Sequence, residues 1–409
     1  MSRVLIVGAG IGGDALALML DRAGWDVTVV EIAPELRAGG QTVDLRGDSR
    51  EVLNGLGLLD ECLLHLVDQR GLAWIDESGE RRAAMPVEAF GGQGFVSSEE
   101  LLRTDLARII HAASGPRTEH RFDETVAQLT ENAHGVHVTF RRHESEMFDL
   151  VVGADGTHSR VRSLAFGPES DFRHPLGLAH AWFTLRETAT TPSVEGWSLM
   201  CNAVGARVIG ARPGHPGEQE VGLTFPADTL PSRKDAEARF ALLERVFADT
   251  GWRTPEFLDA ARSAADFALD TYDQIHVDRW HRGRVVLLGD SAWCASPLSG
   301  LGTALALQGA ESLAAVLGGA VPDDLEQALD AYEREMRPRT TAAQKMYPGR
   351  VRSYAPRTRR GIATMRFVMR VLQTRPIAAL ITRAVADYGR APAAHAAIDR
   401  DAAMLQTTR

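Results

Sequence analysis

The stretch RVLIVGAGIGGDALALMLDRAGWDVTVVE, at residues 3–31, restricts the fold more than any other part of the chain. Its two apolar runs predict buried strands, and the leucines at helical spacing between them predict a helix. Gly8, Gly10 and Gly13 lie between the first strand and the helix in the pattern GxGxxG. In such a turn the first glycine permits the sharp bend, the second admits a pyrophosphate and the third lets the helix pack closely. The segment therefore predicts a βαβ unit that binds a dinucleotide at the start of its helix.

An acidic residue completes this pattern. Glu31 ends the second strand, eighteen residues after Gly13. At this position a carboxylate can accept hydrogen bonds from the ribose hydroxyls of an adenosine, and it repels a 2′-phosphate. A glycine-rich turn without a ligand is the plain alternative, but strand, helix, second strand and terminal acid all agree. The segment alone fits NAD and FAD equally well.

Length and charge point to a small-molecule partner. The 409 residues suit one large composite domain, or two or three domains that share a cleft. Apolar residues make up 44% of the chain and charged residues 24%, which indicates a globular protein. The balance of 45 basic against 54 acidic residues argues against a broad surface for nucleic acid or for anionic membranes.

The cysteines and histidines indicate neither a disulfide framework nor a metal site. Cys62, Cys201 and Cys294 are widely spaced and form no CxxC pair, which predicts a reducing, cytoplasmic setting. The 13 histidines form no metal-ligand motif, so we expect no metal. We see no export signal at the amino terminus, and no apolar stretch of about 18 residues that could cross a membrane.

Two later segments repeat the logic of a strand followed by a glycine turn. DLVVGADGTHSRVRSLAF, at residues 149–166, places Asp155 directly after a buried-strand run. By itself this is an ordinary βα turn. In the second segment, residues 282–317, an apolar run leads into Gly289 and Asp290 and then into a loop and an alanine-rich helix. A carboxylate at the end of that strand can bind a ribityl hydroxyl, and amides at the helix start can face an anionic oxygen.

These motifs together resemble the FAD-dependent aromatic hydroxylases. That family of single-component (class A) flavin monooxygenases includes para-hydroxybenzoate hydroxylase and the tetracycline-inactivating monooxygenases. The three motifs occur in the family's order and at its separations, bracketing residues 3–310. The segment at 101–110 is also similar to the family's arginine-bearing helix start. The resemblance implies that FAD is bound by Gly8, Gly10, Gly13, Glu31, Arg103, Asp155, Gly289, Asp290, Pro297, Gly300, Gly302 and Thr303.

Some positions near the flavin depart from the family or stay open. Trp293 stands where the family usually has histidine, and Thr303 where it often has asparagine. Residues 39–47 resemble the family stretch that passes the isoalloxazine edge, and an ordinary β-hairpin with surface polar groups is an equal alternative. If the resemblance holds, the candidate cleft residues are Gln41, Asp44 and Arg46.

The resemblance also implies an architecture. We expect an α/β fold: a Rossmann-like FAD-binding domain of the GR2 type, an inserted β-sheet substrate domain and a long C-terminal helix. In the middle region His180, Trp182, Met200, Arg212 and Phe225 are possible pocket residues, although a packed or solvent-facing sheet position is the favoured explanation for each of them. The expected boundaries are 1–171 and 271–340 for the FAD-binding domain, 172–270 for the substrate sheet and 341–409 for a helical segment that bridges the domains.

The activity implied by the resemblance is monooxygenation. NADPH or NADH reduces FAD as a transient partner, O₂ forms a flavin C4a-hydroperoxide, and one oxygen atom enters an aromatic or polycyclic, polyketide- or antibiotic-like substrate. A dehydrogenase or double-bond reductase on the same fold stays open, as does a protein that only binds FAD and a ligand. A halogenase is disfavoured because the chain has no Trp-x-Trp-x-Ile-Pro stretch. The motifs do not separate hydroxylation from Baeyer–Villiger insertion.

Overall fold

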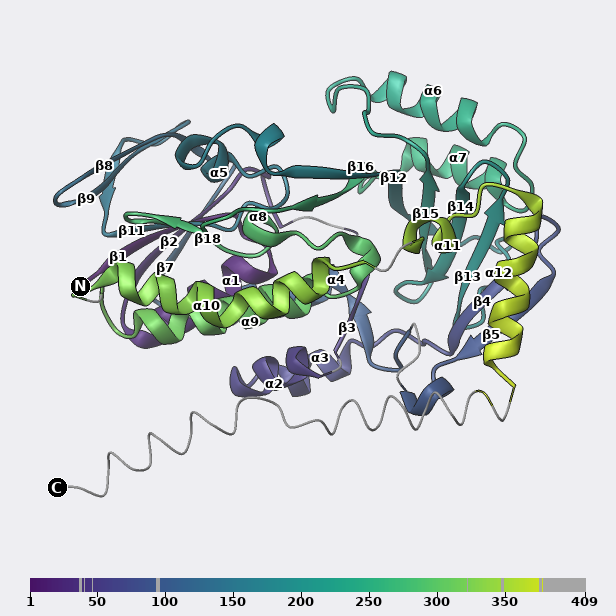
Figure 1. Ribbon diagram of the computed structural model, residues 1–409, viewed down its shortest axis with the longest axis horizontal. Helices are drawn as coiled ribbons and strands as arrows, with labels where there is room; N and C mark the ends of the chain where they lie inside the picture. Colours follow the sequence, from purple (N-terminus) through teal and green to yellow (C-terminus); the bar gives the residue numbers. More distant parts are fainter. Residues whose placement is uncertain are drawn as a thin grey trace.

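Two β-sheets, each covered by helices, lie side by side along the long axis of the molecule (Figure 1). The computed structural model describes residues 1–36, 39, 41–45, 47–92, 96–321, 323–346, 349–374 and 377. The alternation of strands and helices confirms the predicted α/β class. In the described part of the chain, no helix combines the length and the apolar character needed to cross a bilayer.

Six strands of the described chain form the first sheet, in the order β17-β18-β11-β1-β2-β7. All of its pairs are parallel except β17 with β18. Val4, Leu5 and Ile6 of the central strand β1 are fully buried, as expected for a parallel strand covered on both faces. The bounds are β1 (Arg3–Val7), β2 (Asp26–Glu31), β7 (Thr118–Phe122), β11 (Leu150–Gly153), β17 (His281–Arg282) and β18 (Val285–Leu287).

Helices cover one face of this sheet, and a small antiparallel sheet with helix α5 covers the other (Figure 1). On the helical face α1 lies against α9, and α9 against α10. The succession β1-α1-β2 confirms the βαβ unit predicted at residues 3–31. The bounds are α1 (Ile11–Ala23), α4 (Arg103–Ala112), α9 (Gly302–Leu317) and α10 (Leu325–Gln344) on the helical face, and β8 (Val126–Asn132), β9 (Gly135–Phe140), β10 (Glu146–Phe148) and α5 (Arg160–Ala165) on the other.

The second sheet has the order β16-β12-β15-β14-β13-β4-β5 among the described residues. β4 pairs in parallel with β13, and β5 pairs with β4. Both strands lie within residues 1–171, the range that the sequence analysis assigns to the FAD-binding domain. The bounds are β4 (Gly71–Ile75), β5 (Arg81–Pro86), β12 (Arg173–Arg186), β13 (Trp197–Ala203), β14 (Arg207–Pro213), β15 (Glu218–Phe225) and β16 (Ala268–Ile275).

The two faces of the second sheet have different partners. Ala179, Ala181 and Phe183 of β12 alternate toward a core shared with α6 (Ala236–Phe247) and α7 (Thr254–Ser263). The opposite face is covered in part by α11 (Arg350–Tyr354) and by α12 (Arg359–Leu372), which lies beside β5 (Figure 1). That face also turns toward the first sheet, because Leu298 of the first part packs with Leu178 and Tyr272.

Short elements lie between the sheets or at their margins. The two-stranded sheet of β3 and β6 pairs Val43 with Leu101 and lies between the larger sheets (Figure 1). The bounds of these elements are β3 (Thr42–Asp44), β6 (Glu100–Leu102), α2 (Asp48–Gly55), α3 (Leu59–Leu64), α8 (Asp290–Trp293) and three short 3-10 turns at Ala89–Gly92, Glu169–Asp171 and Pro297–Ser299.

Glu220 of β15 is a buried acid that stays protonated to a higher pH than an exposed glutamate. It is only 5% exposed, and Thr184 Oγ1 lies 2.9 Å from Glu220 Oε1 and 2.7 Å from Asp266 Oδ2. A hydroxyl has one proton to donate, so both contacts are hydrogen bonds only if one of the two acids is protonated. Burial raises the pKa of Glu220 to about 7.

We therefore expect Glu220→Gln to change how the free energy of unfolding depends on pH. The folded pKa lies above the unfolded value of about 4.3, so the wild type loses stability as pH rises from about 4 to 7. Glutamine stays neutral and avoids that loss. At pH 8 the variant should be more stable than the wild type by up to about 3 kcal/mol, and near pH 4 the two should coincide.

Urea unfolding at a series of pH values measures this difference. The exposed Glu144→Gln change serves as the control and should leave the pH profile of the wild type unaltered. A stability difference that is the same at pH 4 and pH 8 contradicts the raised pKa assigned to Glu220.

Candidate cofactor and substrate site

Three turns meet at one edge of the first sheet. Val7, Gly153 and Leu287 are the last residues of β1, β11 and β18, and the parallel register places them side by side. The segments that follow these strands are the three motifs found in the sequence. A ligand that spans the carboxyl ends of β1, β11 and β18 therefore contacts all three, as is usual for nucleotides on parallel sheets.

The glycine turn after β1 is closed on one side and open on the other. Gly8 has a φ of +110°, and a Cβ there would lie 2.5 Å from the Ala154 carbonyl oxygen. A Cβ at Gly13 would lie 2.0 Å from the carbonyl oxygen of Gly8. At Gly10, in contrast, a Cβ would meet no described atom within 4 Å. The backbone amides at the start of α1 therefore face open space where an anion can bind.

Glu31 lies beside this turn. One oxygen of its carboxylate accepts a hydrogen bond of 3.0 Å from the Ala9 amide, and the other accepts one of 2.9 Å from the Ala33 amide. These bonds connect the glycine turn to the end of β2. Glu31 is half-buried, so its carboxylate lies at the margin of the turn. The predicted hydrogen bond to a ribose requires this position.

The turn after β18 brings Asp290 and Arg103 together. Gly289 has a φ of +70°, which glycine adopts without strain, and Asp290 begins α8. Desolvation by the surrounding protein raises the pKa of Asp290, and the nearby positive charge of Arg103 lowers it. Both residues retain access to solvent. The structure thus places the arginine at the start of α4 next to the acid of the third motif.

The loop that follows α8 is open on its outer side. Gly300 has a φ of +69°, and a Cβ at Gly300 or Gly302 would meet no described atom within 4 Å. The helix α9 begins at Gly302 without a side-chain cap, and Thr303 is half-buried in its first turn. Leu301 is an exposed large apolar side chain at this point. Pro297 starts the 3-10 turn that shapes the loop.

Asp155 has a local role that the sequence does not reveal. Its carboxylate accepts hydrogen bonds from the Ser159 hydroxyl, from the Arg160 amide at 2.6 Å and from the Val161 amide at 3.1 Å. These groups form the start of α5. Asp155 therefore stabilises the helix that follows its own turn, and its carboxylate is already engaged there.

Trp293 fills the core under α9. Its ring lies 4.3 Å from that of Trp280, and a Cβ at Gly309 would lie 2.8 Å from Trp293 Cζ2. The side chain thus occupies the space that a glycine of α9 leaves. The family resemblance predicts a position close to the flavin, but the indole is directed into the protein interior.

These features fit FAD. The site offers backbone amides at the starts of α1 and α9 for anionic oxygens, acids for ribose and ribityl hydroxyls, and glycines whose missing side chains leave room. Glu31, Asp290 and Arg103 come from three separate elements and lie around the same sheet edge. The sequence analysis predicted each of them.

A polar network lies between this site and the second sheet. Gln41 accepts a 3.1 Å hydrogen bond from the Arg103 amide at its backbone oxygen, and its side-chain Nε2 donates to His180 Nε2 at 2.9 Å. His180 Nδ1 then donates to Thr224 Oγ1 at 2.7 Å. Thr224 lies 3.2 Å from the hydroxyl of Tyr354. Gln41 thus connects the Arg103 end of the cofactor site to the face of the second sheet.

The titratable side chains of this network are uncharged. Burial, and after it the Arg212 charge, lowers the pKa of His180 to about 3, so the imidazole is neutral. Burial raises the pKa of Tyr272, whose hydroxyl lies near Tyr354, and that of Tyr354 itself. The imidazole of His180 fits here because a Cβ at Gly222 would lie only 2.7 Å from its Cε1. The network therefore presents neutral hydrogen-bonding groups.

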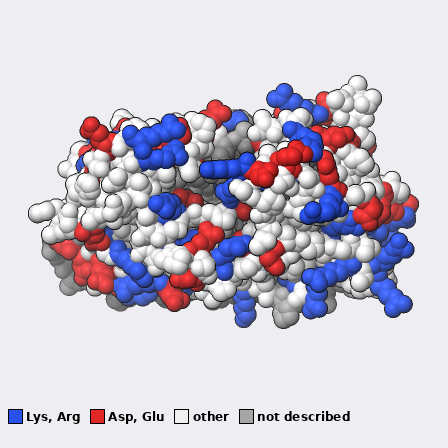
Figure 2. Space-filling view, turned by 90° about the horizontal axis from the view of Figure 1, so that it is seen from above, with Lys and Arg blue, Asp and Glu red and all other residues white. Residues whose placement is uncertain are grey.

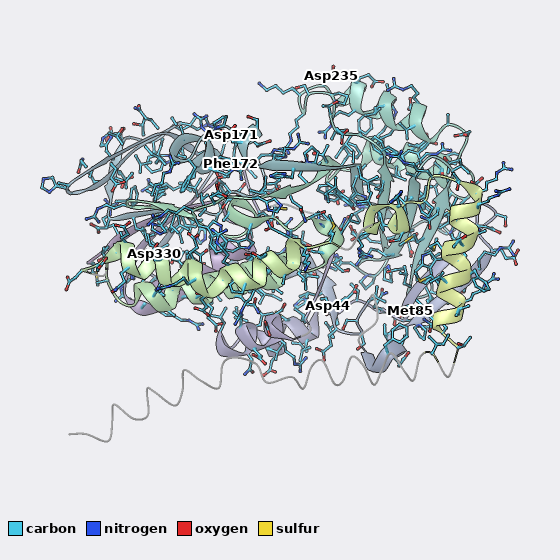
Figure 3. The ribbon with its side chains drawn as sticks, in the orientation of Figure 1. Asp44, Met85, Asp171, Phe172, Asp235 and Asp330 are labelled. Atoms are coloured by element: carbon cyan, nitrogen blue, oxygen red, sulfur yellow. The ribbon has the colours of Figure 1, made fainter. Side chains whose placement is uncertain are left out.

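The other two candidate cleft residues are Asp44 and Arg46. Asp44 pairs with Glu100 across the small sheet of β3 and β6, between the two large sheets (Figure 3). Glu100 is buried and accepts hydrogen bonds from Thr42 at 2.7 Å and Arg212 at 3.1 Å. Arg46 lies outside the described residues.

Of the possible pocket residues in the second sheet, Phe225 lies on the face opposite to the network of His180. Phe225 packs in the core on the opposite face, with its ring 5.9 Å from that of Phe247 in α6, so it is no pocket residue. Neither Thr224 nor Tyr354 was singled out from the sequence. Their contacts depend on strand pairing and on the place of α11, and no local pattern reports either.

Figure 2 shows the distribution of charged side chains on one face of the molecule. On the face shown in Figure 2, basic and acidic side chains are interspersed. This agrees with the small-molecule partner that the composition predicts.

Comparisons with known proteins agree with the site. The family model described as "FAD binding domain" matches residues 1–346. The chain is 40% identical over 338 residues to the uncharacterized protein Rv1260 of Mycobacterium tuberculosis, with 82% of this chain and 90% of that protein covered. It is 31% identical over 396 residues to the FAD-dependent monooxygenase asL4 of Sarocladium schorii, with 90% and 92% covered.

Solved structures show the same architecture. The tetracycline destructase Tet(51) has a TM-score of 0.76 and 26% identity, with 91% of this chain and 97% of that chain covered. Klebsiella pneumoniae HpxO, solved with FAD and uric acid, has a TM-score of 0.69 at 23% identity, with 93% and 96% covered, and supports the fold alone. The chain therefore belongs to the class A family of FAD-dependent monooxygenases, with FAD as its cofactor.

Proposed function

We propose that the protein uses NADPH or NADH, together with O₂, to insert one oxygen atom into an aromatic or polycyclic substrate. In a hydroxylation the balance is substrate–H, O₂, NAD(P)H and a proton giving substrate–OH, water and NAD(P)⁺. The observation that carries the proposal is the neutral network of Gln41, His180 and Thr224, which adjoins the Arg103 end of the cofactor site.

The residues that would hold FAD lie around the carboxyl edge of the first sheet. The amides at Gly10 and the start of α1 bind the pyrophosphate, and Glu31 binds a ribose. Asp290 and Arg103 would bind the remaining polar part of the cofactor, and the backbone amides of Gly300–Thr303 would be available to its anionic oxygens. When bound, FAD supplies the transfer of electrons from NAD(P)H to O₂. The amide groups at the start of α9 stabilise a negative charge that lies near them.

The side of the network that faces the second sheet is aromatic, and its imidazole at His180 is uncharged. The imidazole is stacked with Trp182 at 5.9 Å and lies 5.4 Å from the ring of Tyr272. A flat aromatic ring with a hydroxyl or carbonyl group matches this combination of stacking surfaces and hydrogen bonds. His180 Nε2, which accepts from Gln41 here, can accept from a substrate hydroxyl instead. The protein's part is to orient the substrate and to exclude water.

Oxygen labelling tests the function. The purified FAD-loaded protein is mixed with NADPH or NADH and a panel of polycyclic phenols under ¹⁸O₂, and the products are analysed by mass spectrometry. We expect one member of the panel to accelerate NAD(P)H oxidation and to gain one ¹⁸O atom. A dehydrogenase or reductase changes the substrate without the label, and a protein that only binds shows no stimulated oxidation. Either result overturns the proposal.

His180 is expected to affect substrate use and not FAD binding. His180→Phe keeps an aromatic ring but leaves Gln41 and Thr224 without their hydrogen-bond partner. The hydrogen bonds that are lost correspond to about 1–3 kcal/mol of interaction free energy. If the substrate uses this network, kcat/KM falls roughly 5- to 150-fold while the FAD affinity stays that of the wild type. The exposed His137→Phe change is the control. Equal kcat/KM values for wild type and His180→Phe contradict the assignment.

A further inference from the structure

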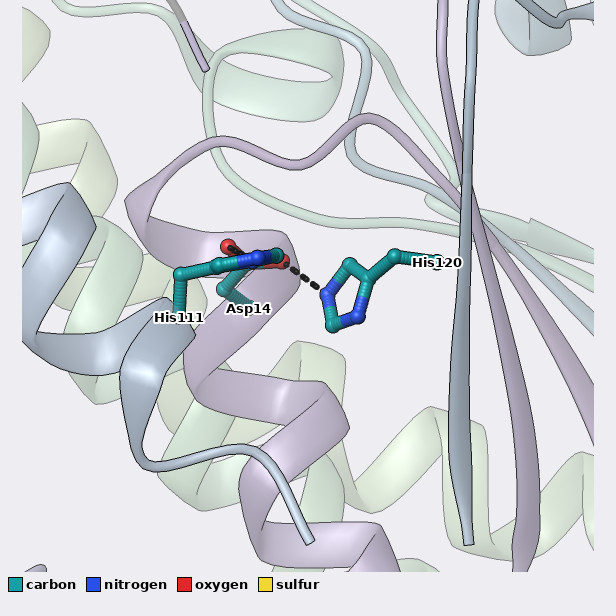
Figure 4. A group of neighbouring side chains, drawn as sticks. All are labelled: Asp14, His111 and His120. Atoms are coloured by element: carbon teal, nitrogen blue, oxygen red, sulfur yellow. Dashed lines mark hydrogen bonds and ion pairs between the residues drawn. The ribbon is translucent and has the colours of Figure 1, made fainter. Parts of the chain in front are cut away.

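A carboxylate and two imidazoles meet at the edge of the first sheet, where α1 packs against α4 and β7. Asp14 lies in the first turn of α1, His111 near the end of α4 and His120 in β7. Figure 4 shows both imidazoles directed toward Asp14. His111 Nδ1 lies 3.2 Å from Asp14 Oδ2, and His120 Nε2 lies 3.2 Å from Asp14 Oδ1. One ligand atom from each residue lies within 4.8 Å of the other two.

The surrounding structure fixes these three side chains. Asp14 is fully buried. Two turns further along α1, Asp21 accepts hydrogen bonds from the Arg117 amide at 2.7 Å and the Thr118 hydroxyl at 3.0 Å, which holds the start of β7 against the helix. Phe122 lies beside both imidazoles, with ring centroids 5.9 Å and 6.3 Å away. The geometry is therefore set by packed elements.

The cluster is also accessible. The side chain of His111 is 27% exposed and that of His120 is 12% exposed, whereas that of Asp14 is 1% exposed. An ion from solvent can therefore approach on the histidine side, while the carboxylate forms the inner wall.

The donor set and its spacing match those of a transition-metal site. Imidazole nitrogens with a carboxylate oxygen are typical ligands of Zn²⁺ and its neighbours in the first row. Bonds of about 2.0–2.1 Å in a tetrahedron place neighbouring ligand atoms about 3.3 Å apart. The two imidazole nitrogens lie 3.2 Å from different oxygens of Asp14, and one ligand atom from each residue lies within 4.8 Å of the other two, so binding of one ion requires these side chains to draw together slightly. Among the described residues the ion-pair partners of Asp14 are these two histidines, so its charge is compensated here only by a proton or by a cation.

We propose that Asp14, His111 and His120 bind one divalent transition-metal ion, with Zn²⁺ as the favoured species. Three protein ligands leave a further coordination position for water. The ion would join α1, α4 and β7. Because α1 and α4 also carry the glycine turn and Arg103, it would brace the elements of the cofactor site. The sequence predicted no metal, since His111 is 97 residues from Asp14 and no short motif joins them.

Metal titration tests this site directly. Tag-free, FAD-loaded protein is treated with a chelator, desalted and titrated with ZnCl₂ by calorimetry and with CoCl₂ by difference absorbance. We expect one ion per chain and d–d bands of a low-coordinate Co²⁺ site. His111→Ala and His120→Ala should each weaken Zn²⁺ binding at least tenfold, about 1.4 kcal/mol. Asp14→Asn, which keeps the size of the side chain but removes its charge, should do the same.

Controls separate loss of the site from loss of the fold. His137→Ala removes an exposed histidine of β9 and should leave Zn²⁺ binding unchanged. Retained FAD and an unchanged circular dichroism spectrum show that a variant is folded. If an alanine variant unfolds, His111→Gln and His120→Gln replace it. The proposal is overturned if the wild type takes up no stoichiometric Zn²⁺, or if the folded cluster variants bind it as tightly as the wild type.

Discussion

A Gly10→Val variant is expected to lose FAD affinity by at least about 100-fold, roughly 2.7 kcal/mol, while its apo form unfolds like the wild type. The reason is that a Cβ at Gly10 meets no described protein atom within 4 Å, so the side chain occupies the space where the pyrophosphate must approach the backbone. Titration of the apo protein with FAD, followed by quenching of flavin fluorescence, measures the affinity. Thermal unfolding of the apo protein measures the stability.

Two matched variants serve as comparisons for Gly10→Val. Gly13→Ala should lose stability as well as FAD, because its Cβ would collide with the Gly8 carbonyl oxygen at 2.0 Å. Gly55→Val lies in α2, where a Cβ also meets no described atom within 4 Å, and should change neither property. If Gly10→Val binds FAD as tightly as the wild type, the pyrophosphate does not lie at the start of α1.

Trp293→Ala is expected to lower the free energy of unfolding by about 3–5 kcal/mol. The indole is 2% exposed and packs against Trp280 at 4.3 Å and Tyr332 at 6.0 Å between ring centroids. Its removal leaves a cavity beneath α9 that the rigid helix cannot fill. Urea unfolding of the apo protein measures the loss.

The same variant decides between two roles for this position. If Trp293 belongs to the core, the folded variant keeps most of its FAD affinity. Trp182→Ala, at a half-buried position of the second sheet, is the control and should cost clearly less stability. A Trp293→Ala protein with wild-type stability but little affinity for FAD would instead show that the indole contacts the flavin.

The elements of the first sheet were predictable because their signals are local. The apolar run, the spaced glycines and Glu31 all lie within residues 3–31, and the structure confirms strand, helix and strand there. The family resemblance assigned the three motifs to one ligand, and the parallel register of β1, β11 and β18 places them at one edge. The resemblance then identified FAD, and the family match confirms it.

The second sheet and the substrate end were not predictable in this way. Residues 71–86 join the second sheet through β4 and β5, although they lie within the range 1–171 that the sequence analysis assigned to the FAD-binding domain. The alternation of a strand shows two faces but not which face meets which partner. Phe225 and Thr224 are neighbours in β15, yet only Thr224 faces the network of His180.

By itself, the sequence determined the α/β class and the βαβ unit with its glycine turn, because strand period and glycine spacing are encoded over a few turns of chain. The choice of FAD over NAD came from the family resemblance. Only the tertiary structure decided that Trp293 turns inward and that Gln41 meets His180. It also decided that His111 and His120 converge on Asp14. The physical reason is the same in each case: a side chain's role depends on which distant element packs against it, and the packing of the whole chain settles that.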